Sequence, residues 1–282
     1  MTIMRVLIVI LVSLVAGACA TAQQPEPAAE PKTSAPVPTD ATDVDVGIRW
    51  VEFSAEYQAV SAQVFAAATR DLPRLLADPD WTALPGQRAA ADKPPAIILD
   101  VDETVVSNAE YQETLAIAPY SRFGHFDWMR KNKAVPIRGA GDLIDAARSA
   151  GVEVFFLTNR ACEPFDDADG DCPYEQVTIE DLREVGIDTD PEHVLMAWEQ
   201  PGWSKEKLNR REHIAKTHRV IMLFGDDYGD FVHCTRAKAL APCAEDATRA
   251  SRHAALDTYA EYWGNGWYIL PNPMHGSWTS VR

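Results

Sequence analysis

The fold of this chain is predicted by the stretch Ala96-Ile97-Ile98-Leu99-Asp100-Val101-Asp102-Glu103-Thr104. Its apolar first half is typical of a strand that is buried on both faces of a parallel sheet. Three acidic residues then follow within four positions. Buried carboxylates are costly unless a cation or a reaction requires them, and ligands of open α/β sheets bind at this end of the strands. We therefore expect a catalytic or metal site here, with an acidic surface turn as the alternative.

Other apolar runs repeat this pattern further along the chain. The run 152–157 is followed by Thr158, Asn159 and Arg160, and the run 219–224 is followed by Gly225, Asp226 and Asp227. Strands are also expected over 193–197 and 267–270, and helices over 140–150, 177–185 and after Ser204. Alternating strands and helices predict an α/β fold, a Rossmann-like parallel sheet flanked by helices. Residues 105–135 predict a small helical cap inserted above the strand ends.

The first 45 residues have the composition of a targeting segment and a linker. Arg5 precedes the apolar run 6–15, and small residues precede Cys19, a pattern that is typical of a signal peptide. We expect a signal peptide over 1–18, a lipid on Cys19 and a disordered Pro/Ala-rich tether over 19–45. Cleavage beside Ala18 or Ala20 without lipidation is the alternative. The globular domain is then expected over 46–282, beginning with a helix over 46–78.

Composition and cysteine content indicate an exported globular protein. Of its 282 residues, 46% are apolar and 24% are charged, and its net charge of -16 argues against a polymeric nucleic-acid partner. Beyond Cys19 lie Cys162, Cys172, Cys234 and Cys243. In an exported protein these predict disulfides, with local pairs as the simplest of three connectivities and a zinc site as the alternative. We expect a location in the cell envelope, with the lipid anchor as the only membrane contact.

The polar strand ends together predict chemistry on a phosphate ester. Mg²⁺ held by Asp100 and Asp226 would offset the repulsion between a carboxylate and a phosphate. Lys207 would neutralise one phosphate oxygen, while the Thr158 hydroxyl and nearby N–H groups would bind the others. Asp100 could then attack phosphorus, and Asp102 could protonate the leaving alkoxide and later activate water.

Four segments resemble the four motifs of the haloacid dehalogenase superfamily. They are Asp100-Val101-Asp102-Glu103-Thr104, Thr158-Asn159-Arg160, Lys207-x-x-Arg210 and Gly225-Asp226-Asp227-x-x-Asp230. Within it, the chain is similar to the bacterial class C acid phosphatases, the lipoprotein 5′-nucleotidase group. That similarity includes the end segments Trp50-x-x-x-Ser54-x-Glu56-Tyr57 and Leu270-Pro271-Asn272-Pro273-Met274.

This resemblance implies roles for the matched residues. Asp100 would be the nucleophile and Asp102 the acid/base, and Asp226 would bind Mg²⁺ together with Asp100 and the backbone carbonyl of Asp102. Supporting roles would fall to Asp227, Asp230 and Arg210. Lys205 is a rival for the role of Lys207, which the spacing to Arg210 favours. The chain departs from the family pattern by carrying His275 in place of Tyr and Thr158 in place of Ser.

Substrate contacts are expected from Asn159 and Arg160. Tyr111 and Trp128 could stack on a base or an aryl leaving group, with core packing as the alternative. We predict a magnesium-dependent phosphomonoesterase that acts on nucleoside monophosphates or similar small esters. Two alternatives stay open: a phosphotransferase that uses an alcohol acceptor, and a non-catalytic surface lipoprotein on the same fold.

Overall fold

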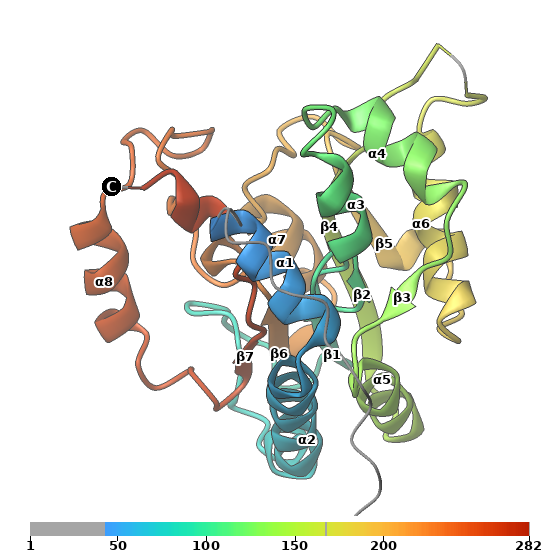
Figure 1. Ribbon diagram of the computed structural model, residues 1–282. Helices are drawn as coiled ribbons and strands as arrows, with labels where there is room; N and C mark the ends of the chain where they lie inside the picture. The colour runs from blue at the N-terminus through green and yellow to red at the C-terminus, as the bar shows by residue number, and fades with distance from the viewer. Residues whose placement is uncertain (1–42, 167, 282) are drawn as a thin grey trace, which may run out of the picture. The chain divides into compact units, whose positions relative to one another are not determined.

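The computed structural model describes residues 43–166 and 168–281 (Figure 1). The predicted signal peptide, the lipidation site at Cys19 and nearly all of the predicted tether lie outside these residues. Within the described part of the chain, no helix combines the length and the apolar character that crossing a membrane requires.

The centre of the fold is a five-stranded parallel sheet with the order β5-β4-β1-β6-β7. Its strands are β1 Pro95–Leu99, β4 Glu153–Ala161, β5 Val194–Ala197, β6 Arg219–Gly225 and β7 Trp267–Ile269. Ile98 of β1 lies opposite Phe155 of β4 and Leu223 of β6. β1 lies between β4 and β6, so the strand order does not follow the sequence order. This arrangement is Rossmann-like and confirms the predicted fold class.

Strand β1 is buried on both faces, as its apolar sequence predicts. Ile97 and Leu99 enter one hydrophobic cluster, and Ala96 and Ile98 enter another. The first cluster includes residues of α2 Ala55–Ala77, α5 Ala140–Ser149 and α6 Pro173–Glu184. The second includes Ile214 of α7 Leu208–Ala215 and residues of β7. Helices therefore cover both faces of the sheet, and α2 and α5 lie side by side in Figure 1.

The N-terminal helical segment is two helices rather than one. α1 covers Asp43–Phe53 and α2 covers Ala55–Ala77. Ser54 separates them: its backbone is extended, and its hydroxyl accepts a hydrogen bond from the N–H of Tyr57 (3.0 Å) and donates one to the carbonyl of Trp50 (2.6 Å). The continuous helix predicted over 46–78 is therefore wrong at Ser54, because this side chain caps a new helix.

Helix α1 packs against the C-terminal tail. A Cβ atom at Gly47 would lie 2.7 Å from the carbonyl oxygen of Pro273, so glycine permits this close approach. Ile48 and Val51 form a small buried cluster that includes Met274. The first described helix therefore holds the tail segment that reaches the candidate site.

The segment predicted as a cap contains two short helices and a two-stranded ribbon. These are β2 Val106–Ser107, α3 Ala109–Thr114, α4 Arg122–Met129 and β3 Val135–Pro136, with β2 and β3 antiparallel. α4 packs against α6, where the rings of Phe126 and Tyr174 are 5.5 Å apart. Figure 1 shows α3 and α4 on the same side of the molecule as α6.

The remaining elements follow the prediction with one shift. Helix α7 begins at Leu208, so Lys205 and Lys207 precede it, and Ser204 accepts a hydrogen bond from the N–H of Glu206 (3.1 Å) without capping the helix. Both local disulfides are present, Cys162–Cys172 and Cys234–Cys243. The last described elements are η1 Pro191–His193, η2 Tyr228–Asp230, α8 Arg249–Thr258 and η3 Ser277–Thr279.

Candidate active site

Residues at the carboxyl ends of the three central strands line one cavity of about 460 Å³. Asp100 directly follows β1, Asn159 lies near the end of β4, and Asp226 directly follows β6. The N–H of Asp100 donates to the carbonyl of Phe224 (3.0 Å), which keeps Asp100 in register with β6. Parallel strands end at the same edge, so residues far apart in the sequence meet there.

Asp100, Asp226 and Asp230 form a compact acidic cluster. One carboxylate oxygen from each lies within 4.8 Å of the others. Burial raises the pKa of Asp100 to about 7, against the opposing effect of Lys207. Burial and the charges of Asp100 and Asp230 also raise the pKa of Asp226 well above its usual range. The surrounding protein groups therefore leave negative charge incompletely balanced at this point.

Lys207 inserts a buried ammonium group into this cluster. Its Nζ donates to Asp100 Oδ1 (2.5 Å) and to Asp230 Oδ1 (2.7 Å). Arg211, one turn further along, donates to the main-chain carbonyl of Asp230 and so ties α7 to η2. Of the two candidate lysines, Lys207 contacts the acidic cluster and Lys205 lines the cavity.

Asp102 has a different environment, because Arg160 is its partner. Arg160 Nη2 lies 2.7 Å from Asp102 Oδ1, and Nε lies 3.1 Å from both carboxylate oxygens. Nη1 donates to Thr178 (3.0 Å) and Asp181 (2.9 Å). Burial acts to raise the pKa of Asp102, but Arg160 outweighs it and holds this pKa well below its usual range. Its guanidinium is thus engaged by protein oxygens, and because Arg160 also lines the cavity, the expected contact with substrate stays a prediction.

Arg210 organises the end of β4. Its guanidinium donates to the carbonyl of Thr158 (2.5 Å), to the side chain of Asn159 (2.7 Å) and to the carbonyl of Ser204 (3.0 Å). Asn159 lines the cavity. The Thr158 side chain is fully buried, and its hydroxyl lies 3.4 Å from Asp102 Oδ2 and accepts the N–H of Arg160 (3.1 Å). The Thr158 hydroxyl is therefore directed at Asp102.

Two neighbouring carboxylates receive hydrogen bonds from the C-terminal tail. Asn272 Nδ2 donates to Asp226 Oδ2 (2.7 Å). Asp227 accepts the N–H of Gly229 (2.8 Å) and both the N–H and the hydroxyl of Ser277. Burial acts to raise the pKa of Asp227, but these hydrogen bonds lower it overall. Asp227 therefore joins η2 to the tail, and Asn272 orients Asp226.

Glu103 and Asn272 also belong to the site, although the sequence predicted no role for them, nor the partner of His275. Glu103 is buried, has a left-handed backbone (φ 57°) and lies 2.9 Å from His275 Nε2. The N–H of Asn108 donates to the other oxygen of Glu103 (2.7 Å). These residues stand in the segments that carried the resemblance, but a contact across 172 positions leaves no local pattern in the sequence.

A buried polar chain runs from Asp102 into the cap. Asn108 Nδ2 donates to Asp102 Oδ1 (2.9 Å), Asn108 Oδ1 lies 3.2 Å from His125 Nε2, and His125 Nδ1 lies 2.9 Å from the hydroxyl of Tyr174. Burial lowers the pKa of His125 to about 4. This chain fixes the cap helices α3 and α4 to the strand-end carboxylates.

The two predicted stacking residues occupy different positions. Tyr111 lines the cavity, although its side chain is largely buried. Trp128 does not belong to the cavity lining and packs against Tyr111, with ring centroids 5.5 Å apart. Tyr120 also lines the cavity and is 54% exposed. The accessible aromatic surface of the cavity therefore comes from Tyr111 and Tyr120.

The acidic cluster suits a small divalent cation. Magnesium prefers oxygen ligands and is held by few carboxylates, which Asp100 and Asp226 provide. Both have raised pKa values, as expected for buried carboxylates that lack sufficient positive charge. Asp230 belongs to the cluster, but its oxygens already accept Lys207 and the N–H of Asp227 (2.9 Å).

The fold is a Rossmann-like sheet with a helical cap, and acidic residues and a buried lysine meet at its strand ends. This combination defines a class of α/β enzymes that act on phosphate esters. The sequence model for the HAD superfamily, subfamily IIIB (acid phosphatase), matches residues 13–278. The chain belongs to this family and is a phosphomonoester hydrolase. Among solved structures it is similar to two of the class C acid phosphatase from Bacillus anthracis, one of which is described with tungstate bound. Each match has 26% identity and a TM-score of 0.66, and covers 83% of this chain and 86% of the other.

Proposed function

We propose that this phosphomonoesterase is magnesium-dependent and forms an aspartyl-phosphate on Asp100. The observation that carries the proposal is the cluster of Asp100 and Asp226 beside the buried ammonium of Lys207. Asp100 and Asp226, with the main-chain carbonyl of Asp102, would hold Mg²⁺. When bound, the cation would offset the carboxylate charges and polarise the phosphoryl group.

The first chemical step is attack on phosphorus by a carboxylate oxygen of Asp100. The bond from phosphorus to the leaving oxygen breaks as the new bond forms, and the substrate loses its alcohol. Lys207, already bonded to Asp100 Oδ1, orients the nucleophile and lies where it can neutralise phosphoryl charge. The second step is attack by water on the same phosphorus, which releases phosphate and restores Asp100.

Asp102 is our proposed proton carrier. It gives a proton to the leaving oxygen in the first step and takes one from water in the second. Its pairing with Arg160 favours the ionised form that the second step needs. We further propose that Thr158, whose hydroxyl faces Asp102, positions this carboxylate together with Arg160.

Nucleoside monophosphates or similar small esters are the proposed substrates. A cavity of about 460 Å³ has room for a leaving group of that size, and Tyr111 and Tyr120 offer ring surface to it. Asn159 lies in the lining and could donate to the substrate, since its amide oxygen is held by Arg210.

The proposed location is outside the cytoplasm. The two disulfides support it, because such bonds persist in oxidising compartments. A signal peptide over 1–18 and a lipid on Cys19 remain proposals from the sequence. Mass spectrometry of the mature N-terminus would test both.

The function is tested by a panel of phosphate esters assayed with Mg²⁺ and with chelator. We expect phosphate release from nucleoside 5′-monophosphates and aryl phosphates in Mg²⁺, little release in chelator, and no cleavage of a phosphodiester. Adding an alcohol acceptor distinguishes hydrolysis from phosphotransfer, because a transferase forms a new ester. Full activity in chelator, or no hydrolysis of any ester, would contradict the proposal.

A further inference from the structure

Lys205 lines the catalytic cavity but takes no part in the chemistry described above. It lies two positions before Lys207, and the two ammonium groups have different surroundings. Lys207 pairs with Asp100 and Asp230. For Lys205, no carboxylate of residues 43–166 and 168–281 lies within 4.0 Å of its Nζ. The lining of the catalytic cavity thus includes a cation that has no carboxylate partner among the described residues.

A second cavity, of about 560 Å³, adjoins the catalytic one at Lys205. Lys205 and Tyr120 line both cavities. The far wall of the second cavity includes Trp198, Phe123 and Arg122. A leaving group that extends out of the catalytic cavity would therefore pass Lys205 and meet aromatic side chains.

The ammonium of Lys205 lies over the ring of Trp198. Lys205 Nζ lies 6.0 Å from the centroid of the Trp198 ring, and Arg122 Cζ lies 5.9 Å from it. Trp198 has a left-handed backbone (φ 63°), which is uncommon for a bulky residue, and its side chain is 41% exposed. Arg122 is neutralised by Glu163 at 2.5 Å. Of the two cations near Trp198, Lys205 is thus the one without a carboxylate partner among the described residues.

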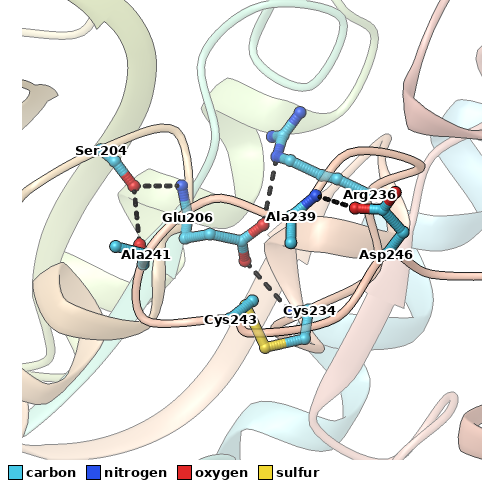
Figure 2. The surroundings of a disulfide bond; sticks show 8 residues. All are labelled: Ser204, Glu206, Cys234, Arg236, Ala239, Ala241, Cys243 and Asp246. Atoms are coloured by element: carbon cyan, nitrogen blue, oxygen red, sulfur yellow. Dashed lines mark hydrogen bonds and ion pairs between the residues drawn. A yellow bond between two sulfur atoms is a disulfide. The ribbon is translucent and has the colours of Figure 1, made fainter.

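The segment around Lys205 is anchored on both sides. Figure 2 shows that Ser204 donates to the carbonyl of Ala241 (3.2 Å) and that Glu206 accepts the N–H of Cys234 (3.2 Å). Glu206 is buried and also lies 3.3 Å from Arg236 Nε, and Arg236 donates to the carbonyl of Lys205 (3.1 Å). The loop closed by Cys234–Cys243 therefore fixes the backbone from which Lys205 projects.

The local charges favour an anion beside Lys205. Burial and the positive charges of Arg236 and Arg122 lower the pKa of Lys205, so its own charge is disfavoured there. In a chain with a net charge of -16, such a concentration of cations is unusual. A bound anion would offset the repulsion among them.

We propose that Lys205 is a specificity-determining residue that binds a second anionic group carried by the leaving group. The preferred substrates would be phosphomonoesters whose alcohol or phenol also bears a carboxylate or another phosphate. Lys205 lines both cavities and so lies where such a group would arrive. This inference rests on the proposed function, because it concerns the leaving group of the same hydrolysis.

The test compares matched pairs of esters in the intact protein. Each pair consists of a carboxylate-bearing aryl phosphate, such as 4-carboxyphenyl phosphate or its longer 2-carboxyethyl analogue, and its uncharged amide. We expect Lys205→Met to lower the ratio of kcat/KM for carboxylate over amide by about tenfold, the effect of one hydrogen bond to a charged group. Lys205→Arg should retain the ratio. Lys238→Met, an exposed charge on the same disulfide loop and outside both cavities, should leave it unchanged.

Several outcomes would overturn the inference while leaving the proposed function intact. One is a Lys205→Met ratio within about twofold of wild type, and another is an equal loss on both esters. If Lys205→Met does not fold, the ratio of kcat/KM for carboxylate over amide is measured for wild type at increasing ionic strength. This ratio should fall, because salt screens the contact with Lys205. A constant ratio would overturn the inference. Failure of wild type to hydrolyse either ester would instead refute the proposed function, and this inference with it.

Discussion

Asp100 and Asp102 stand two residues apart at the end of one strand, and their carboxylates have opposite environments. Asp100 has Lys207 as a partner but shares this one ammonium with Asp230 and also lies beside Asp226, and burial raises its pKa to about 7 despite Lys207. Asp102 is paired with Arg160, and its pKa is lowered. Burial acts in the same direction on both, so the difference comes from their partners.

This difference separates two uses of a buried carboxylate. A carboxylate that is paired with a protein cation is held in one orientation, and its ionised form is favoured. A carboxylate left among like charges is poised for a ligand that brings positive charge, because the ligand relieves the repulsion. The predictions below test this contrast, beginning with the largest expected effect.

Removing the charge of Asp100 should abolish turnover. Asp100→Asn eliminates the proposed nucleophile, and we expect kcat to fall by at least about 1000-fold. Phosphate release in Mg²⁺ measures this, and circular dichroism checks the fold. Asp145→Asn, an exposed change on α5, is the matched control and should be fully active. Wild-type turnover by Asp100→Asn would remove Asp100 from the chemistry.

Removing Arg160 should leave Asp102, like Asp100, as a buried carboxylate whose charge is not fully balanced. Arg160→Met leaves Asp102 and Asp181 buried without their cation, and we expect the free energy of unfolding to fall by about 3 kcal/mol. Urea unfolding in chelator measures it. The double variant Arg160→Met/Asp181→Asn should recover part of the loss, since it leaves one fewer uncompensated charge. A single-variant change below about 0.5 kcal/mol would show that Arg160 is not what distinguishes Asp102.

The pH dependence of stability should reveal Asp100 separately. Because its folded pKa of about 7 exceeds the ordinary value near 4, the native metal-free protein binds a proton that the unfolded chain lacks between these pH values. This contribution to stability is present at low pH and is lost as pH rises toward 7. Relative to wild type, the unfolding free energy of Asp100→Asn should therefore increase by about 2 kcal/mol from pH 5 to pH 7.5.

Comparing the two proteins cancels the shared groups whose pKa values do not depend on Asp100. His125, for example, has a pKa lowered to about 4, so its contribution has the opposite sign and is lost as pH falls below its ordinary value. Asp226 is not one of these groups, because the charge of Asp100 raises its pKa, and its change acts in the same direction as the loss of Asp100. Thermal or urea unfolding in chelator at both pH values gives the difference. A pH-independent difference between the proteins would mean that Asp100 is ionised normally.

Much of this site could be anticipated from local sequence. Asp100 and Asp226 each follow an apolar run directly, and a parallel sheet brings such positions to one edge. The spacing from Lys207 to Arg210 also distinguished it from Lys205, and the ammonium of Lys207 does contact the acidic cluster. These inferences depend on short spacings, which the sequence displays.

Other features depend on contacts between distant segments. Arg160 was expected to touch substrate, and the sequence did not reveal that its guanidinium also pairs with Asp102, 58 positions away. Trp128 was a stacking candidate as an aromatic residue of the predicted cap, and it packs against Tyr111 outside the cavity lining. The break at Ser54 was missed because the apolar pattern continues through it, while the side chain caps α2.

The sequence by itself determined the parallel sheet, the edge where the acidic residues gather and the family to which the chain belongs. It could do so because apolar periodicity and residue order are local properties of the chain. The tertiary structure alone decided which carboxylates are neutralised and which remain in excess, and where Lys205 points. Those outcomes depend on burial and on distances of a few ångströms between segments, because electrostatic energies change steeply over that range in a low-dielectric interior.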